Sequence, residues 1–464
     1  MKRERFEDLE VIDINSKGKG VLKSNDGRVI FVQGAVPGDK VTIETYKKKG
    51  GYFEARLIEV NQPSPNRINP VCKHFGICGG CKWQNLSYKM QLQFKQKEIL
   101  HNLKNISGMV LPKIDKIKAA EQTYFYRNKM EYTFSDKRWL SAEEIKIKTE
   151  TLEKKGLGFH KAGMWDKVVD IDKCHLQQEP ANAIRNCVKQ FALDNNLEFF
   201  NHKEQSGFLR TLMIRNSSQG EFMVLIQFYR EDIANREAIL KHLKDKFNLT
   251  SLLYCINSKA NDTLYDQEII VYSGSEFITE VMEKLKFKIN AKSFFQTNSN
   301  QAYELYKITR EFAGLKGYEL VYDLYTGTGT IAQFIADKCN KVVGIESVPE
   351  AIAVAKESAE INGITNAFFE VGDIRKVFNQ DFINRHGVAD VVITDPPRNG
   401  MHPDVIKQLL NLTPDKIVYI SCNNATQARD LSLMKEKYKL SKCQALDMFP
   451  QTQHIENIVL LEKI

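Results

Sequence analysis

The sequence lacks any long hydrophobic run and any leader-like start. No stretch of about 18 or more apolar residues occurs in the 464-residue chain, so neither a transmembrane helix nor a membrane partner is expected. The N-terminal segment, 1–8, is mostly charged and has no apolar core behind it. That pattern argues against a secretory signal and predicts a cytoplasmic location.

The sequence also lacks the cysteine pattern of a disulfide-bonded protein. Its nine cysteines are an odd number and are mostly scattered. Three of them lie close together, namely Cys72, Cys78 and Cys81. Thiols at this spacing can surround one metal centre, either zinc or an iron–sulfur cluster. Such a centre needs a fourth ligand, for which Cys174 is the best distant candidate. The alternatives are His74 and His175, and either histidine would favour zinc.

Neither sign of charge dominates. The net charge is +8 and the isoelectric point is about 8.8, a mild excess that fits a polyanionic partner and fits an ordinary basic protein equally well. Apolar residues make up 42% and charged residues 27% of the chain, which is enough apolar surface for real hydrophobic cores. The length predicts about three domains.

The predicted domains are residues 1–62, 72–290 and 291–464, with a proline-rich linker at 61–71. The first alternates at the strand period between glycine turns, which predicts a small OB-like β-barrel. The second mixes strands and helices without a regular order, which predicts an α+β domain. The third alternates strands and helices, which predicts a doubly wound α/β sheet that binds ligands at its carboxyl strand ends.

The predicted barrel carries one candidate nucleic-acid contact. Lys47–Lys49 are predicted to form a basic loop, and Tyr52 and Phe53 follow it. Lysines neutralise phosphates and aromatic rings stack on bases. A solvated hairpin tip with aromatic residues in the core is an equally good interpretation.

A glycine loop follows the first strand of the predicted α/β domain. The loop has Gly327 and Gly329 but lacks the third glycine of the dinucleotide fingerprint, which suits a cofactor without a pyrophosphate. Glu346 ends the next strand, where a carboxylate can accept both ribose hydroxyls. This layout is typical of S-adenosylmethionine (SAM) methyltransferases, and a glycine turn that serves only helix packing is the plainer alternative.

Two further strand ends carry polar groups. Asp395 ends one strand and is followed by two prolines and Arg398, which stiffen the turn. Cys422 ends another strand next to a helix N-terminus, which can lower the pKa of a thiol and activate it, although a lone cysteine is usually inert. Glu456, close to His454, is either a surface acid or a general base.

The chain resembles the SAM-dependent RNA uracil-C5 methyltransferases over nearly its whole length. Five segments carry the resemblance: 294–298 (FFQTN), 323–329 (DLYTGTG), 395–400 (DPPRNG), 419–430 (YISCNNATQARD) and 454–456 (HIE). Two positions depart from the common pattern. Asn424 stands where many members have proline, and Gln453 stands where many have glycine.

The resemblance implies a mechanism and a set of catalytic residues. Cys422 would attack C6 of a uracil to form a covalent adduct, C5 would take the methyl group of SAM, and Glu456 would remove the C5 proton. Gln296, Tyr325, Glu346 and Asp395 would contact the cofactor, and Asp395 would lie between the cofactor and the base. The base must leave its stack to reach the thiol.

The resemblance also implies cofactors and partners. The first domain would be a TRAM domain that binds RNA. The spacing of Cys72, Cys78, Cys81 and Cys174 is similar to that of bacterial 23S rRNA methyltransferases with a [4Fe–4S] cluster. A uridine of 23S rRNA would be the target of a monomeric enzyme, with the T-loop uridine of tRNA as the alternative.

Three other classes fit the residues less well. Amino-group methyltransferases favour an aromatic residue where this chain has Arg398, and they need no thiol. Radical SAM enzymes use a cysteine spacing that is absent from this sequence. A non-catalytic RNA-binding protein would not need Cys422.

Overall fold

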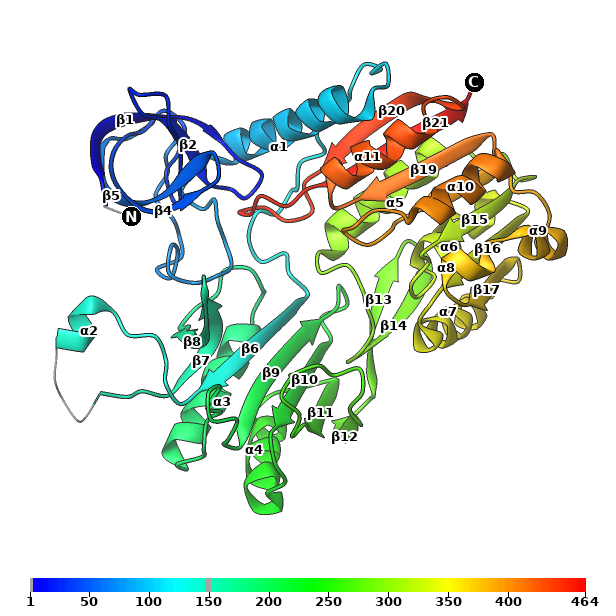
Figure 1. Ribbon diagram of the computed structural model, residues 1–464. Coiled ribbons are helices and arrows are strands. Elements are labelled where there is room, and N and C mark those ends of the chain that lie inside the picture. Colours follow the sequence, from blue (N-terminus) through cyan, green and yellow to red (C-terminus); the bar gives the residue numbers. More distant parts are fainter. Residues whose placement is uncertain (1–2, 147–151) are drawn as a thin grey trace.

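The N-terminal part of the chain is a small closed β-barrel in the computed structural model, which describes residues 3–146 and 152–464 (Figure 1). Its strands close in the order β1-β2-β3-β5-β4. Their bounds are β1 Arg5–Ile14, β2 Gly20–Lys23, β3 Val29–Val32, β4 Lys40–Lys49 and β5 Tyr52–Gln62. Apolar residues such as Val11, Leu22 and Ile43 alternate along the strands and are buried inside the barrel.

The predicted basic loop of the barrel is wrong in one respect. Lys47–Lys49 continue strand β4, and only Gly50 and Gly51 turn the chain into β5. Antiparallel pairing sets Lys48 opposite Phe53, with its Nζ atom 5.7 Å from the ring centroid. The lysines and the aromatic rings are therefore neighbours because of strand pairing rather than a shared loop.

A seven-stranded sheet forms the middle of the chain, in the order β12-β11-β10-β9-β6-β7-β8. Its strands are β6 Lys129–Ser135, β7 Gly156–Lys161, β8 Met164–Asp170, β9 Leu209–Asn216, β10 Phe222–Phe228, β11 Ser251–Ile256 and β12 Ile270–Gly274, and its helices are α2 Ala142–Lys146, α3 Ala181–Asp194 and α4 Ile233–Lys246. On one face, Leu212 and Val224 pack in a core with α3 and α4. On the other face, Met213 and Leu225 belong to a core shared with the C-terminal part. Strands and helices are mixed here, as predicted.

The C-terminal part is a second seven-stranded sheet, in the order β17-β16-β15-β18-β19-β21-β20. The five strands β15 to β19 are parallel and β21 returns antiparallel to β19. The hairpin of β13 Phe277–Met282 and β14 Leu285–Asn290 and helix α5 Ser299–Ala313 precede it. The elements of the sheet and its helices are β15 Leu320–Leu324, α6 Thr330–Ile335, η2 Ala336–Lys338, β16 Lys341–Glu346, α7 Pro349–Ile361, β17 Ala367–Val371, α8 Ile374–Val377, α9 Gln380–His386, β18 Val391–Thr394, α10 Pro403–Leu412, β19 Lys416–Ser421, α11 Asn424–Met434, β20 Tyr438–Leu446 and β21 Glu456–Lys463. Buried clusters cover both faces, as expected of a doubly wound sheet.

Helix α1 (Tyr88–Asn102) joins the front of the chain to this sheet. It continues into a π-helical turn, η1 (Leu103–Ser107), which ends at Gly108 with a left-handed φ of 64°. Ile99 and Leu103 are buried in the same core as the C-terminal sheet. Figure 1 shows α1 running from the barrel towards α11 and β20. The helix therefore bridges segments that are far apart in the sequence.

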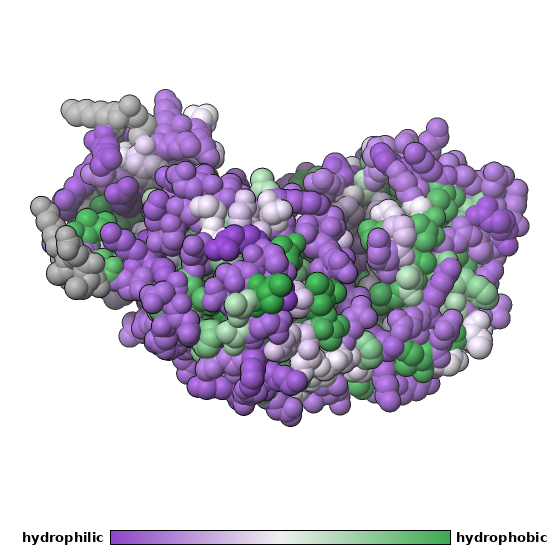
Figure 2. All heavy atoms as spheres, turned by 90° about the horizontal axis from the view of Figure 1, so that it is seen from below, coloured by the Kyte–Doolittle hydropathy of each residue, from purple (hydrophilic) through white to green (hydrophobic). Residues whose placement is uncertain are grey.

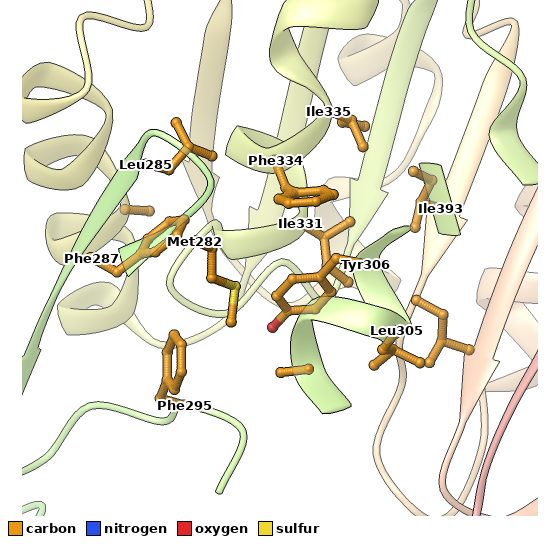
Figure 3. Packing of buried hydrophobic residues seen from close by; sticks show 14 of the residues in the cluster. Met282, Leu285, Phe287, Phe295, Leu305, Tyr306, Ile331, Phe334, Ile335 and Ile393 are labelled. Carbon is orange, nitrogen blue, oxygen red and sulfur yellow. The ribbon is translucent and has the colours of Figure 1, made fainter. Parts of the chain in front are cut away.

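Hydrophobic packing fixes the segment that leads into α5. Figure 3 shows Phe295 beside Met282 and Phe287 in one buried cluster, with ring centroids of the two phenylalanines 6.4 Å apart.

Hydrophilic side chains cover most of the face seen in Figure 2, with hydrophobic ones gathered in smaller areas. Within residues 3–146 and 152–464, no helix is both long and apolar enough to cross a membrane.

Candidate active site

The carboxyl ends of four parallel strands bring the predicted groups to one edge of the C-terminal sheet. Strands β15 and β18 end side by side, and so do β18 and β19. Tyr325 follows β15, Asp395 follows β18 and Cys422 follows β19, while Glu346 is the last residue of β16. These four residues therefore share the edge where doubly wound sheets bind ligands.

Glu456 reaches Cys422 through the antiparallel strand. Asn457 in β21 lies opposite Ser421 at the end of β19. In this register the preceding residue of one strand faces the following residue of the other, so Glu456 and Cys422 are cross-strand neighbours. The thiol and the acid proposed from the sequence are thus brought together although they are distant in the chain.

Burial dominates the environment of the Cys422 thiol. Its pKa is raised to about 11, first by burial and then by the carboxyl groups of Glu456 and Asp395. The helix that begins at Asn424 is capped by the Asn423 side chain, which accepts the N–H groups of residues 425 and 426. The lowering of a thiol pKa that a helix N-terminus can cause is therefore outweighed here by burial beside two acids.

Burial also raises the pKa of both acids of the site. Glu456 is only 5% exposed, and its pKa is raised well above the usual value by burial and then by Asp395. The pKa of Asp395 is raised to about 7 by burial and then by Asp323. Each group is therefore a stronger base, when ionised, than an exposed carboxylate.

Arg398 supplies positive charge to the same site. Its guanidinium lowers the pKa of both Cys422 and Glu456, against the larger effect of burial. The Arg398 carbonyl oxygen accepts hydrogen bonds from Asn423 Nδ2 at 2.9 Å and from Thr426 Oγ1 at 3.1 Å. The turn after Asp395 is therefore attached to the start of α11, which fixes Asp395 and Cys422 relative to each other.

The glycine loop after β15 is built around Glu346. One carboxylate oxygen of Glu346 accepts the N–H of Gly327 at 3.2 Å, and the other accepts the N–H groups of Ser347 and Val348 at 2.6 and 3.0 Å. Gly329 has φ 72°, and a Cβ atom there would lie 2.7 Å from the Phe369 ring. At Gly327, by contrast, a Cβ atom would meet nothing within 4 Å. The loop is therefore tightly packed at Gly329 and has open space at Gly327, which fits a bound ligand there.

Two more predicted cofactor residues are Tyr325, at the start of this loop, and Gln296, before α5. Tyr325 has a left-handed backbone with φ 64°, a strained conformation for a tyrosine, and burial raises its pKa to about 12. Gln296 lies in the segment before α5, where its carbonyl oxygen accepts a hydrogen bond from Asn128 Nδ2 at 2.9 Å. Asn128 precedes β6, so the central sheet helps to fix this segment.

Helix α1 contacts the loop that leads into Glu456, residues 447–455, through buried polar side chains. Lys95 Nζ donates to Asp447 Oδ1 at 2.5 Å and to the carbonyl oxygen of Phe449 at 3.2 Å, and both charged side chains are fully buried. Gln91 exchanges hydrogen bonds with Gln451, one to its side chain at 3.0 Å and one from its backbone at 2.9 Å. Helix α1 therefore helps to position the 447–455 loop, which leads into Glu456, the proposed base.

Other parts of the chain contact the 447–455 loop. The backbone N–H groups of Lys82 and Trp83, just after Cys81, donate to the carbonyl oxygen of Gln451 at 2.8 and 3.0 Å. His454 in this loop is partly buried, and its pKa is lowered to about 4, mainly by burial and then by Arg398. Its imidazole is therefore neutral at neutral pH.

Sequence reasoning missed Gln91 and Lys95 because their partners lie far away in the chain. The available signal was their spacing, since positions 91, 95 and 99 lie on one face of a helix and Ile99 is apolar. A lysine on the same helical face as core residues indicates a buried polar contact.

The four candidate metal ligands lie near one another. The pKa of Cys78 is raised to about 12 and that of Cys81 to about 11, chiefly by burial, and Cys72 and Cys174 contribute to both shifts. His74 instead accepts the backbone N–H of Asp172 through Nε2 at 3.2 Å. In the part of the chain that the structure describes, no three Cys, His, Asp or Glu side chains are arranged closely enough to hold a metal ion. The donor set fits a four-thiolate centre, and the geometry of such a centre is not formed.

The whole chain is similar to known RNA methyltransferases. The family described as tRNA (uracil-5-)-methyltransferase matches residues 88–464. An uncharacterised RNA methyltransferase from Porphyromonas gingivalis is 48% identical over 461 residues, covering 98% of this chain and 99% of the relative. Another from Bacteroides thetaiotaomicron is 50% identical over 451 residues, covering 96% and 99%.

A solved structure is similar over the same length. The Pyrococcus abyssi tRNA (uracil-54, C5)-methyltransferase in complex with S-adenosyl-L-homocysteine has a TM-score of 0.76 and 29% identity, with 99% of this chain and 100% of that chain covered. The match includes both the barrel and the C-terminal sheet. With its glycine loop, acids and thiol on one sheet edge, the chain belongs to the tRNA (uracil-5-)-methyltransferase family and is an RNA methyltransferase.

Proposed function

We propose that this protein transfers a methyl group from SAM to C5 of a uridine in RNA through a covalent adduct with Cys422. The observation that carries the proposal is the closeness of Cys422 to Glu456 and Asp395: Ser421 pairs with Asn457 between β19 and β21, and both acids raise the pKa of the thiol. A nucleophile and a base on the same face of one substrate are what this reaction needs, because uracil C5 is a poor nucleophile until C6 is attacked.

Each proposed step has a residue on this edge. The Cys422 thiolate forms a bond to C6, and the electron pair of the C5–C6 double bond moves towards the O4 carbonyl, which makes C5 nucleophilic. Bound SAM supplies the methyl group that C5 takes. Glu456 then accepts the C5 proton, the double bond re-forms, and the C6–sulfur bond breaks to return the thiolate. Arg398 favours ionisation of the thiol, and Asp395 orients the base or the cofactor amine.

The residues proposed to hold SAM fit a ligand without a pyrophosphate. Glu346 lies partly exposed at the end of β16 beside the open space over Gly327. Tyr325 begins the same loop, and Gln296 is proposed as a further cofactor contact from the segment before α5. The SAM analogue in the Pyrococcus abyssi enzyme supports the same ligand class for this chain.

We propose a [4Fe–4S] cluster on Cys72, Cys78, Cys81 and Cys174, each of which would supply one thiolate. Methyl transfer from SAM needs no electron, so the role of this centre is structural. Protein purified without air should be brown and lose its colour in Cys174→Ser. A colourless protein that contains zinc would refute the cluster.

The division into residues 1–62, 72–290 and 291–464 is part of the proposal, with the barrel as an RNA-binding TRAM domain in a monomeric cytoplasmic enzyme. A uridine of 23S rRNA is the proposed target, by the resemblance of the barrel and the cysteine segment. The T-loop uridine of tRNA is the second candidate, favoured by the full-length likeness to a tRNA enzyme. Mapping 5-methyluridine in both RNAs from a deletion strain decides between them.

The test of the mechanism uses 5-fluorouracil-containing RNA, in which fluorine at C5 blocks release of the adduct. The protein should form a stable covalent complex with this RNA in the presence of SAM, and Cys422→Ala should form none. Cys187→Ala is the matched control, because Cys187 is also a partly buried free thiol but lies on α3, outside the site. Methyl transfer by Cys422→Ala would refute the proposal.

A further inference from the structure

Three aromatic side chains lie between the cysteine segment and the 447–455 loop. The ring of His175 lies 6.0 Å from the ring of Phe125 and 6.5 Å from the ring of Tyr124, measured between centroids. Phe125 is 41% exposed, and the other two rings are partly exposed. We call Tyr124, Phe125 and His175 the aromatic platform. The mechanism above makes no use of it.

Phe125 has a strained backbone. Its φ is 55°, in the left-handed region that glycine adopts freely and a bulky residue seldom does. Neighbouring backbone hydrogen bonds hold this conformation, since Phe125 N–H donates to the His175 carbonyl oxygen at 2.9 Å and Arg127 N–H donates to that of Leu176 at 2.7 Å.

Packing accounts for this strain only in part. Phe125 is 41% exposed, so its ring gains less from burial than a core phenylalanine does, whereas glycine at the same φ would have no steric penalty. Strain that is retained at a partly exposed aromatic residue is typical of residues that serve a functional site.

The residues that follow the platform, Tyr126 and Arg127, contact the 447–455 loop of the proposed active site. The Tyr126 hydroxyl donates to the carbonyl oxygen of Pro450 at 2.9 Å, and the Arg127 guanidinium lies 5.4 Å from the centroid of the Phe449 ring. Pro450 and Phe449 belong to the loop that leads into Glu456. Arg127 is partly exposed, although its Nε is buried and has no hydrogen-bond partner among residues 3–146 and 152–464.

We propose that the aromatic platform receives an unpaired base of the RNA adjacent to the target uridine, which stacks on Phe125 while Arg127 binds the neighbouring phosphate. The inference rests on the proposed function, because a uridine that leaves its stack exposes the faces of its neighbours. Aromatic side chains and arginine are the usual partners of such unpaired bases, and stacking tolerates any base identity.

The test compares Phe125→Gly with Phe125→Trp. Phe125→Gly should raise the KM for RNA about tenfold, as loss of one stacked base does. Its urea midpoint should change little, because the released strain offsets the lost burial and the greater freedom of glycine in the unfolded chain. Its kcat at saturating RNA should change little, and Phe125→Trp should retain the KM of the unmodified protein. Tyr318→Ala is the control, because Tyr318 is 67% exposed just before β15, at the opposite edge of the sheet.

A second measurement reads the stack directly. RNA with 2-aminopurine next to the target uridine, on its 5′ or its 3′ side, should lose fluorescence on binding the unmodified protein and keep it with Phe125→Gly. An unchanged KM and unchanged quenching in Phe125→Gly would overturn the inference. A strongly lowered urea midpoint would also overturn it, because it would make Phe125 a structural residue. Failure of the proposed function would show separately, as absence of 5-methyluridine formation by the unmodified protein.

Discussion

Replacing Lys95 by methionine should destabilise the protein far more than a typical lysine substitution. Lys95 and Asp447 are both fully buried and joined at 2.5 Å, so Lys95→Met leaves an unpaired buried carboxylate. Removing one partner of a buried ion pair costs about 3–5 kcal/mol, whereas replacing both with apolar groups is often neutral. Lys95→Met should therefore be strongly destabilised, and adding Asp447→Leu should recover most of the loss.

Activity should not recover with stability. Lys95 Nζ also binds the Phe449 carbonyl oxygen, and neither methionine nor leucine replaces that hydrogen bond. In the double variant the loop that leads into Glu456 is less well fixed, so kcat should fall while the KM for SAM is unchanged. Urea unfolding monitored by fluorescence measures stability, and transfer of labelled methyl groups measures activity.

These variants show whether the Lys95–Asp447 pair only stabilises the protein or also positions the 447–455 loop. Lys97→Met on the same helix is the control, because Lys97 is largely exposed and its contact with Asp13 lies at the surface. A Lys95→Met protein as stable as the control would refute the energetic argument. A double variant with full kcat would refute the positioning role of α1.

Glu456→Gln should leave adduct formation intact and block release, because an amide does not accept the C5 proton. Covalent RNA–protein complex should therefore accumulate on denaturing gels with ordinary uridine, and Glu462→Gln on the same strand should accumulate none. Arg398→Gln should shift the pH profile of kcat/KM to higher pH. The Cys422 thiol, whose pKa is already raised to about 11, loses the cation that favours its ionised form. An unchanged profile would show that Arg398 does not act on the thiol. Gly329→Ala should lower stability by about 1–3 kcal/mol through backbone strain and weaken SAM binding in calorimetry, since its Cβ would lie 2.7 Å from Phe369. Gly363→Ala, with φ 63° and no neighbour within 4 Å, should weaken only stability.

The C-terminal sheet was predictable because its signals are local. Strand ends, the glycine loop and the acid at Glu346 are each defined by a few consecutive residues, and parallel topology brings their positions together. The closed barrel was predictable for the same reason, from alternation and turns. Lys47–Lys49 were misplaced because a lysine run has no preference that separates a strand end from a loop.

The electrostatics of the site could not be predicted from the sequence. The pKa of Cys422 depends on how deeply the thiol is buried and on Asp395 and Glu456, which approach it from other strands. The buried contacts of Gln91 and Lys95 were missed for a similar reason, since their partners lie in the last hairpin of the chain. Tertiary contacts of this kind leave almost no trace in local patterns.

The contacts between α1 and the 447–455 loop have a consequence for biosynthesis. The residues they join are 352 and 360 positions apart, so nearly the whole chain must be made before Lys95 and Gln91 find their partners. Domains fold from the N-terminus during translation, but α1 lacks its final contacts until β20, the 447–455 loop and β21 have left the ribosome. A chain that ends early lacks Glu456 and leaves a buried lysine without its counter-ion. The same contacts that position the base therefore make the completion of folding at α1 depend on the last hairpin of the chain.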